Sequence, residues 1–340
     1  MLQPLVIGLG RAGSGLHLRA LAKARVEAAE LFPAGPVVAC DLDPEVRRNS
    51  SGVHTVDSVS AAAELLDPAT TVAHVCTPPT QRVSVLAELA VHGFRQVIIE
   101  KPLATDTHAL ESVCQLVHQH GLDLAVVAHW LDSELTARLV SLVRGGRLGP
   151  LRGITVAQHK PRFTRSASAG EHPTAFDVEV PHSLGVVLRL AGPADLLDAE
   201  WTDMHCDGSV FPRVGSAQLT LQHHNGVRSA IGSDLTSPVQ ERRIALEFTR
   251  GNATGHYPIS DRDHHAQLVV AGRRQIFPDD ALTRFLVLAY RHFDGNRGRF
   301  DGNQADHGTF DLHCDIVRLV DAAKHRCALV PPERIVDHAG

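Results

Sequence analysis

The segment that most constrains the fold is at the very start of the chain. An apolar, β-branched run, PLVIGL, leads directly into GLGRAG at residues 8–13. This G-x-G-x-x-G pattern is followed by helix-like periodicity, and a strand, a glycine turn and a helix in this order form the first unit of a parallel α/β sheet. Glycines there let the backbone approach a pyrophosphate at the helix N-terminus. The predicted dinucleotide contacts in this loop are Gly8, Gly10, Arg11, Ala12 and Gly13.

Up to about residue 128, strand-like runs alternate with helix-like stretches. The later runs are PVVACD, TVAHVC, QVIIE and DLAVVA, and the helix-like stretches cover residues 13–30, 60–66, 81–92 and 105–120. That alternation is typical of a parallel sheet with helices on both faces. We therefore expect an NAD-binding Rossmann domain over residues 1–128.

The pattern changes after Trp130. A helix is predicted over 133–143, and then come longer alternating runs such as RGITVAQHK and SAQLTLQHHNGVRSAIGSD, with Asn-Gly and Gly-Asn turns between them. Further helices are predicted over 181–190, 280–293 and 310–325. A chain of 340 residues can form two cores. The expected fold class is α/β, with a second domain over 129–340 that contains a large, mostly antiparallel open sheet and serves substrate binding and oligomerisation.

Asp41, at the end of the second strand-like run, is placed to bind an adenosine ribose through both hydroxyls. Leu42 and Asp43 follow it, so no arginine is next in line to meet a 2′-phosphate, and a second carboxylate would repel one. The pattern favours NAD over NADP. The alternative is that Asp41 only caps the next turn.

The ends of later strands carry further candidates, because ligands bind outside the carboxyl ends of strands in an open α/β sheet. Lys101 at this edge could reach the nicotinamide half of the cofactor, with Glu100 fixing its ammonium. His129 is a candidate for the pocket rim and could equally be structural. The cofactor-binding candidates from these loops are Cys76, Thr77, Pro78, Glu100, Lys101 and His129.

Four motifs in this order, GLGRAG, ACD, VCTPP and EKPLA, resemble the glucose–fructose oxidoreductase / inositol dehydrogenase (Gfo/Idh/MocA) family. The resemblance covers nearly the whole chain. It implies a Rossmann domain followed by an open-sheet domain that often mediates oligomer contacts, so a homodimer or homotetramer is expected. It also implies NAD(P)-dependent oxidation or reduction of a ring carbon of a sugar or cyclitol, with Lys101 as the catalytic lysine.

The family commonly has an aspartate and, four residues later, a histidine at a helix start in the second domain. Here the histidine is His182, and Val178 stands where the aspartate is expected. Asp177 and Glu179 flank that position, so either one could orient His182, or neither could. Arg82 is a second departure, because many members have histidine there. Packing or substrate contact is the predicted role of Arg82.

The expected chemistry needs a base at a secondary alcohol. His182, in the first turn of its helix, could accept the hydroxyl proton, while Lys101 stabilises the developing alkoxide. The alternative interpretation of FDVEVPHSLGVV is an ordinary helix start, with a proline at the first helical position and acids nearby.

Composition narrows the partners. With a net charge of -5 and no basic stripe, neither nucleic acid nor a membrane is expected, and the Met1 end has no signal-like segment, which predicts a cytoplasmic protein. The six cysteines lack zinc-site spacing, so no metal is predicted. The leading hypothesis is an NAD-dependent dehydrogenase of a carbohydrate-like substrate; acidic pocket residues would suit a polycationic one, as in aminoglycoside biosynthesis. The competing hypothesis is a non-catalytic NAD-binding sensor.

Overall fold

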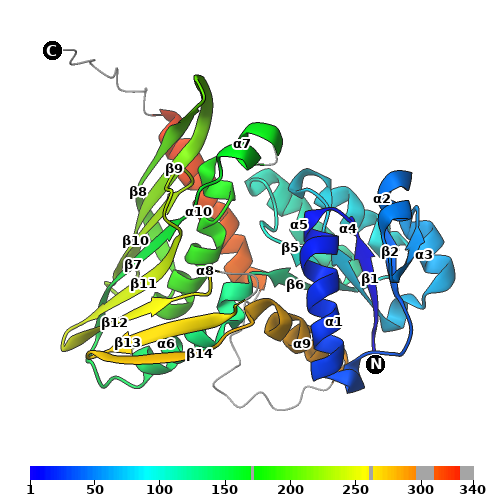
Figure 1. Ribbon diagram of the computed structural model, residues 1–340, viewed down its shortest axis with the longest axis horizontal. Helices are drawn as coiled ribbons and strands as arrows, with labels where there is room; N and C mark the ends of the chain where they lie inside the picture. Colours follow the sequence, from blue (N-terminus) through cyan, green and yellow to red (C-terminus); the bar gives the residue numbers. More distant parts are fainter. Residues whose placement is uncertain (170–171, 260–262, 296–309, 330–340) are drawn as a thin grey trace.

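The computed structural model describes residues 1–169, 172–259, 263–295 and 310–329. In these residues two sheets are separated by a layer of helices (Figure 1). The first sheet is entirely parallel, in the order β3-β2-β1-β4-β5-β6. Its strands are β1 (Gln3–Ile7), β2 (Val37–Cys40), β3 (Val53–Val56), β4 (Thr71–Val75), β5 (Gln96–Glu100) and β6 (Asp123–Val127). This is the Rossmann order, which confirms the predicted fold class of the first domain.

Helices cover both faces of the first sheet. A π-helical turn, Gly13–His17, leads into α1 (Leu18–Glu27), and the later helices are α2 (Pro44–Asn49), α3 (Val59–Leu65), α4 (Arg82–Val91) and α5 (Thr107–His120). The sequence marks several helix starts, because Asp43, Ser58 and Asp106 accept hydrogen bonds from the first turns of α2, α3 and α5. The sequence-based prediction missed α2 and β3. Both are short, and neither has a clear hydrophobic period.

The second sheet has the order β14-β13-β12-β11-β7-β10-β9-β8. Neighbouring strands are antiparallel except β7 and β10, which are parallel, so the prediction of a mostly antiparallel sheet is confirmed. The prediction overlooked β8 and β14. The strands are β7 (Leu151–His159), β8 (Ala194–Cys206), β9 (Ser209–His223), β10 (Arg228–Asp234), β11 (Glu241–Phe248), β12 (Gly251–His256), β13 (His265–Val270) and β14 (Arg273–Pro278).

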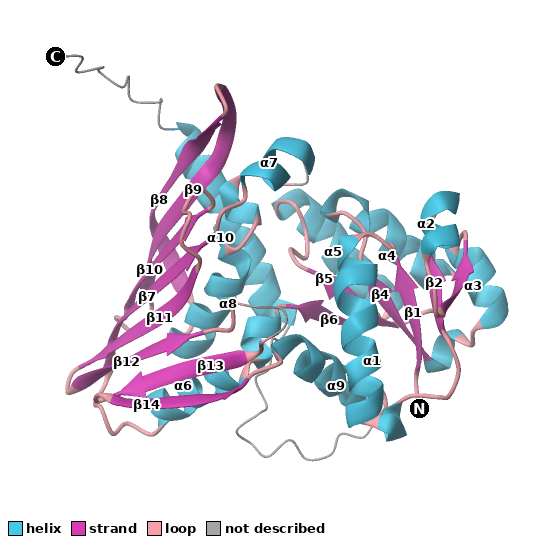
Figure 2. Cartoon of the chain, in the orientation of Figure 1, coloured by secondary structure: helices cyan, strands magenta, loops and turns pink. Residues whose placement is uncertain are grey.

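Three helices, α6 (Glu134–Arg144), α8 (Val180–Ala191) and α10 (Phe310–Leu329), share a hydrophobic core with the second sheet and cover its inner face (Figure 2). Nearly every residue of α8 is buried, since it lies between this sheet and α10. The segment before it contains α7 (Phe163–Ala169) and a short 3₁₀ turn, Ala175–Asp177. The inner face of the second sheet therefore presents the start of α8 toward the first domain.

The last helices return to the first domain. α9 (Ala281–Phe293) packs against α1, and Tyr290 lies in the same core cluster as Leu21. In α10, Cys314 and Val317 join the core around β5 and α5. The expected boundary at residue 128 stays a prediction, and residues 330–340 of the proposed second domain lie outside the described residues. Whatever the boundary, the carboxyl-terminal helices hold the two sheets together.

Candidate active site

The glycine loop is closely packed on one side and open on the other. Gly8 has a φ of +88°, a conformation that favours glycine, and a Cβ at Gly13 would lie 2.0 Å from the Gly8 carbonyl oxygen. At Gly10 a Cβ would meet nothing within 4 Å. Arg11, with its side chain exposed, and Ala12 complete the turn. Open backbone at the start of a helical segment is what a bound pyrophosphate requires, so these residues fit a dinucleotide.

Asp41 lies directly after β2 and contacts the glycine loop. Its Oδ2 accepts a hydrogen bond from the Leu9 backbone N–H at 2.7 Å, and its Oδ1 accepts one from Asp43 at 2.9 Å. The contact with Asp43 caps the turn after β2, which is the alternative role that the sequence allowed for Asp41. An ionised carboxylate has about four acceptor positions, so these two bonds leave capacity for ribose hydroxyls.

Arg47, which the sequence-based prediction did not consider, reaches the same corner. Its Nη1 donates to the carbonyl oxygens of Asp41 at 2.6 Å and Leu42 at 2.9 Å. The sequence shows no arginine within two residues after Asp41, but α2 folds back and places this guanidinium there. The lack of a neighbouring arginine therefore no longer supports NAD over NADP.

The loop after β4 adjoins the glycine loop, as expected. A Cβ at Gly8 would lie 3.2 Å from atoms of both Cys76 and Thr77, and these two residues are half-buried while Pro78 is exposed. Arg82, in the first turn of α4, is 2% exposed, and its Nη2 donates to the Lys101 carbonyl oxygen at 3.1 Å. Arg82 therefore packs against the backbone of the EKP loop.

The ammonium of Lys101 points toward the second domain. Its Nζ donates to the backbone carbonyl oxygen of Val178 at 2.6 Å. Glu100 accepts the backbone N–H of Lys101 at 3.1 Å, and its other oxygen contacts a ring nitrogen of His17 at 3.1 Å. The expectation that Glu100 fixes the Lys101 ammonium is therefore wrong, because that carboxylate is already engaged elsewhere.

Burial lowers the pKa of Lys101 to about 8. The positive charges of Arg82 and Arg162 lower it as well, and the carboxylates of Glu100 and Asp177 act in the opposite direction. Lys101 can therefore gain or lose a proton near neutral pH, which an ordinary surface lysine cannot do.

His182 lies in the first turn of α8 and is 5% exposed. Its ring centroid is 4.6 Å from that of His129 and 5.8 Å from that of Trp130, on which it stacks. Burial, together with the neighbouring His129 and Lys101, holds the pKa of His182 well below its usual 6.5, so the ring is neutral. His129 begins the 3₁₀ turn after β6 and thus contacts His182 from the carboxyl end of that strand.

Neither candidate acid orients His182. The carboxylate of Glu179 accepts a hydrogen bond from Gln158, near the end of β7, and pairs with Lys160, which directly follows β7. Asp177 pairs with Lys324 of α10 and accepts from Thr174 in a capping box. The Nδ1 of His182 has no hydrogen-bond partner among the described residues. Of the three alternatives that the sequence left open, these contacts favour the one in which neither acid orients His182, because each acid is paired with a lysine.

Several of these partners carry no local sequence signal. Lys160 and Gln158 lie about twenty residues before α8, and Lys324 lies in the last helix. Buried histidines at positions 17 and 74, inside a helical and a strand segment, also contact the site. Only their low exposure, which the sequence does not show, distinguishes them from ordinary core histidines.

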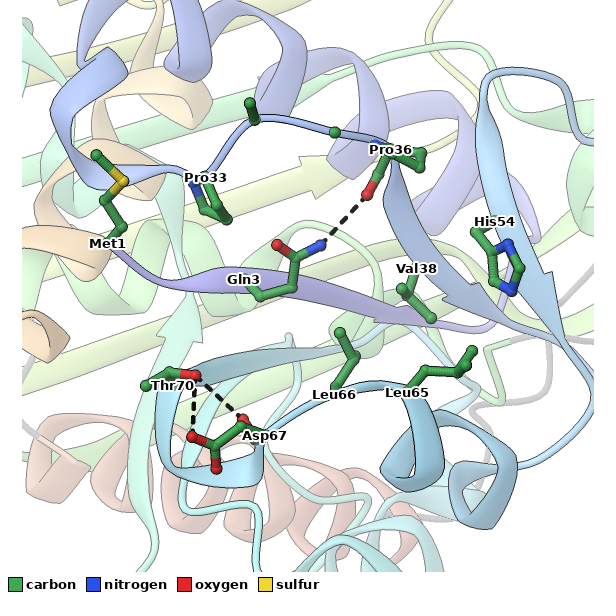
Figure 3. A pocket seen from close by; sticks show the side chains of 12 residues that line it. Met1, Gln3, Pro33, Pro36, Val38, His54, Leu65, Leu66, Asp67 and Thr70 are labelled. Carbon is green, nitrogen blue, oxygen red and sulfur yellow. Dashed lines mark hydrogen bonds between the residues drawn. The ribbon is translucent and has the colours of Figure 1, made fainter.

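A pocket lies at the opposite end of the strands of the first sheet (Figure 3). It has a volume of about 570 Å³, and Gln3, Pro36 and Thr70 line it at the amino ends of β1, β2 and β4. Ligands of open α/β sheets bind at the carboxyl ends, where the glycine loop and Lys101 lie. This pocket is therefore separate from the candidate active site.

Comparison with protein families agrees with the geometry of the first domain. Residues 2–128 match the family model described as "Oxidoreductase family, NAD-binding Rossmann fold", GFO_IDH_MocA. The amino-terminal part of the chain is thus similar to the Gfo/Idh/MocA oxidoreductases. No curated protein is significantly similar to the chain in sequence.

Solved structures resemble the chain over almost its whole length. An oxidoreductase from Thermotoga maritima is 15% identical, with a TM-score of 0.76 and coverage of 96% of each chain. KijD10, a 3-ketoreductase from Actinomadura kijaniata, is 15% identical, with a TM-score of 0.74 and coverage of 96% of this chain and 98% of that chain. The KijD10 structure is a complex with TDP-benzene and NADP. At this identity the likeness shows that the chain has the same overall fold as these two structures.

Two further kinds of feature are absent from the described part of the chain. None of its helices is long and apolar enough to cross a membrane. It contains no group of three or more histidine, cysteine, aspartate or glutamate side chains arranged to hold a metal ion.

Proposed function

We propose that the protein is an NAD-dependent oxidoreductase that transfers a hydride between nicotinamide and a ring secondary alcohol or ketone of a sugar, aminosugar or cyclitol. The observation that carries the proposal is the contact between the two halves of the site. The ammonium of Lys101, from the first domain, reaches the backbone of Val178, four residues before His182. Two proton-exchanging or hydrogen-bonding side chains thus converge at the sheet edge that also holds the glycine loop.

The glycine loop and Asp41 would hold the dinucleotide, and when bound it supplies the hydride acceptor or donor. Lys101 would exchange the proton at the substrate oxygen, since a pKa of about 8 suits proton transfer near neutral pH. His182, which stays neutral, would hydrogen-bond the same oxygen and orient it. This assignment reverses the roles expected from the sequence, because burial makes His182 the weaker base.

Support for NAD over NADP rests on Asp41, whose carboxylate would repel a 2′-phosphate. Arg47 at the same corner weakens that preference, and KijD10 was solved with NADP. The aminoglycoside hypothesis also loses a premise. Glu179 and Asp177, the acids expected to anchor a polycation, are already paired with Lys160 and Lys324. The proposal is therefore made for a carbohydrate ring without a stated charge.

A substrate panel tests the proposal against the non-catalytic alternative. The full chain is incubated with NAD⁺ or NADP⁺ and cyclitols, sugars, aminosugars or nucleotide sugars, and NAD(P)H formation is followed by absorbance. Ketosugars with NADH or NADPH test the reverse direction. Turnover that is lost in Lys101→Met supports the enzyme. Tight NAD binding without turnover of any compound in either direction would favour a sensor.

A further inference from the structure

A chain of hydrogen-bonded polar side chains runs from α9 to Glu100, the residue next to Lys101. The Nε2 of His17 lies 3.1 Å from Glu100 Oε1, and its Nδ1 lies 2.8 Å from the Nδ1 of His74. The Nε2 of His74 lies 2.9 Å from the Tyr290 hydroxyl. The side chains of His17, His74 and Tyr290 are 0% exposed. These three buried groups, from α9, β4 and the first helical turn, and the partly buried Glu100 of β5 thus form one hydrogen-bonded chain.

The contact between the two Nδ1 atoms defines where the protons are, because such a bond holds a single proton. Burial alone would lower the pKa of His17, but Cys76 and Glu100, by charge and by hydrogen bonding, outweigh it and raise the pKa to about 10. Burial and the charge of His17 hold the pKa of His74 well below its usual value. His17 is therefore a cation that donates to both Glu100 and His74, and His74 is neutral and donates onward to Tyr290.

This arrangement determines what Glu100 can do for its neighbour. One oxygen of Glu100 is paired with His17, and the other accepts the backbone N–H of Lys101. The Lys101 ammonium donates its hydrogen bond to the Val178 carbonyl oxygen instead, which is polar but carries no net charge. In addition to Glu100, the charged groups that face Lys101 are Arg82 from α4, Arg162 after β7 and Asp177 before α8.

We propose that His17 is a positioning residue of the active site, which holds the Glu100 carboxylate away from the Lys101 ammonium and thereby keeps Lys101 directed toward the substrate and able to release its proton. His17 lies four residues after Gly13, so it also connects the glycine loop to the EKP loop. The inference rests on the catalytic role proposed above for Lys101. It assigns a function to a residue that neither the motifs nor the site chemistry required.

The test measures the titration of Lys101 without any substrate. The full chain is labelled with trace acetic anhydride across pH 6–11, and peptide mass spectrometry gives the acetylated fraction of Lys101. The wild-type curve should have its midpoint near pH 8. His17→Gln keeps a hydrogen-bonding group but removes the cation, so Glu100 should turn to the ammonium and move the midpoint up by about 1 unit or more.

A second variant acts on the same chain from the other side. His74→Leu removes the acceptor for His17 Nδ1–H and should favour neutral His17, which shifts the Lys101 midpoint in the same direction. His118→Gln, on the exposed face of α5, is the matched control and should leave the midpoint unchanged. Thermal unfolding verifies that each variant is folded.

A midpoint that stays in place or falls in a folded His17→Gln or His74→Leu protein would overturn the inference. Because labelling needs no turnover, this result is distinct from failure of the proposed function, which the substrate panel reports. With a substrate in hand, the same shift should appear in the pH profile of kcat, and affinity for NAD should be nearly unaffected.

Discussion

The two halves of the candidate site are built in different ways. The first-domain half consists of short motifs at the carboxyl ends of β1, β2, β4 and β5, and its residues lie where the motifs predict. The second-domain half, at the start of α8, depends on distant partners: Lys160 near β7 engages Glu179, and Lys324 in α10 engages Asp177. The residues proposed to bind a ligand follow a local pattern, whereas their hydrogen-bond and ion-pair partners come from distant parts of the chain.

Among the variants that test these two halves, substitution of Lys101 should have the largest effect on turnover. Lys101→Met removes the ammonium but keeps much of the side-chain volume, and kcat should fall by about 100- to 10,000-fold, the range for loss of a proton-transferring group. NAD affinity, measured by fluorescence titration, should change little. Wild-type turnover in this variant would show that Lys101 takes no part in the reaction.

The pH dependence shows which half exchanges the proton. The pKa of Lys101 is lowered to about 8, so its neutral, proton-accepting form accumulates above pH 8. Oxidation of the alcohol should therefore accelerate as pH rises through about 8, and reduction of the ketone, which needs the ammonium, should slow. The pKa of His182 lies well below 6.5, so an alcohol oxidation rate that is flat from pH 7 to 9 would point to His182 instead.

Lys324 tests whether α10 aligns the two halves. Its Nζ pairs with Asp177 and also donates to the Thr105 carbonyl oxygen of the EKPLAT segment at 3.3 Å. Lys324→Met would leave Asp177, which is 6% exposed, without its cation, and should cost about 3 kcal/mol in the free energy of unfolding. Urea titration measures the loss. Lys324→Arg should restore most of it, and an unchanged kcat in a folded Lys324→Met protein would show that the bridge is only structural.

The smallest effect is expected at the ribose corner. Asp41→Ala should weaken NAD binding by about tenfold, as expected for about 1.4 kcal/mol of lost hydrogen bonding to a charged group. NADP should then bind relatively better, because Arg47 would remain at that corner without the carboxylate. Calorimetric titration with both dinucleotides measures this. Unchanged selectivity would mean that Asp41 serves only the glycine loop and the turn.

Much of the fold follows from patterns in the sequence. The βα alternation predicts the parallel sheet because apolar runs of a few residues, separated by amphipathic stretches, can be buried in few other ways. Short or largely exposed elements lack such a pattern and were not predicted, as β3, α2, β8 and β14 show. The histidine pair at 223 and 224 illustrates the limit: it directly precedes an Asn-Gly turn signal, but His223 is buried and contacts Gly192 and Ser229.

The sequence alone was sufficient to select the glycine loop, Asp41 and Lys101 as candidates, because each follows a strand at a position that local backbone geometry sets. His182 became a candidate through the resemblance to the family. The tertiary structure decided how these groups are charged and partnered. It assigned Glu100 to His17 rather than to Lys101, gave both acids near His182 to lysines, and lowered the pKa of Lys101 by burial. Charge and proton affinity depend on burial and on neighbours across the whole chain, and no local pattern contains that information.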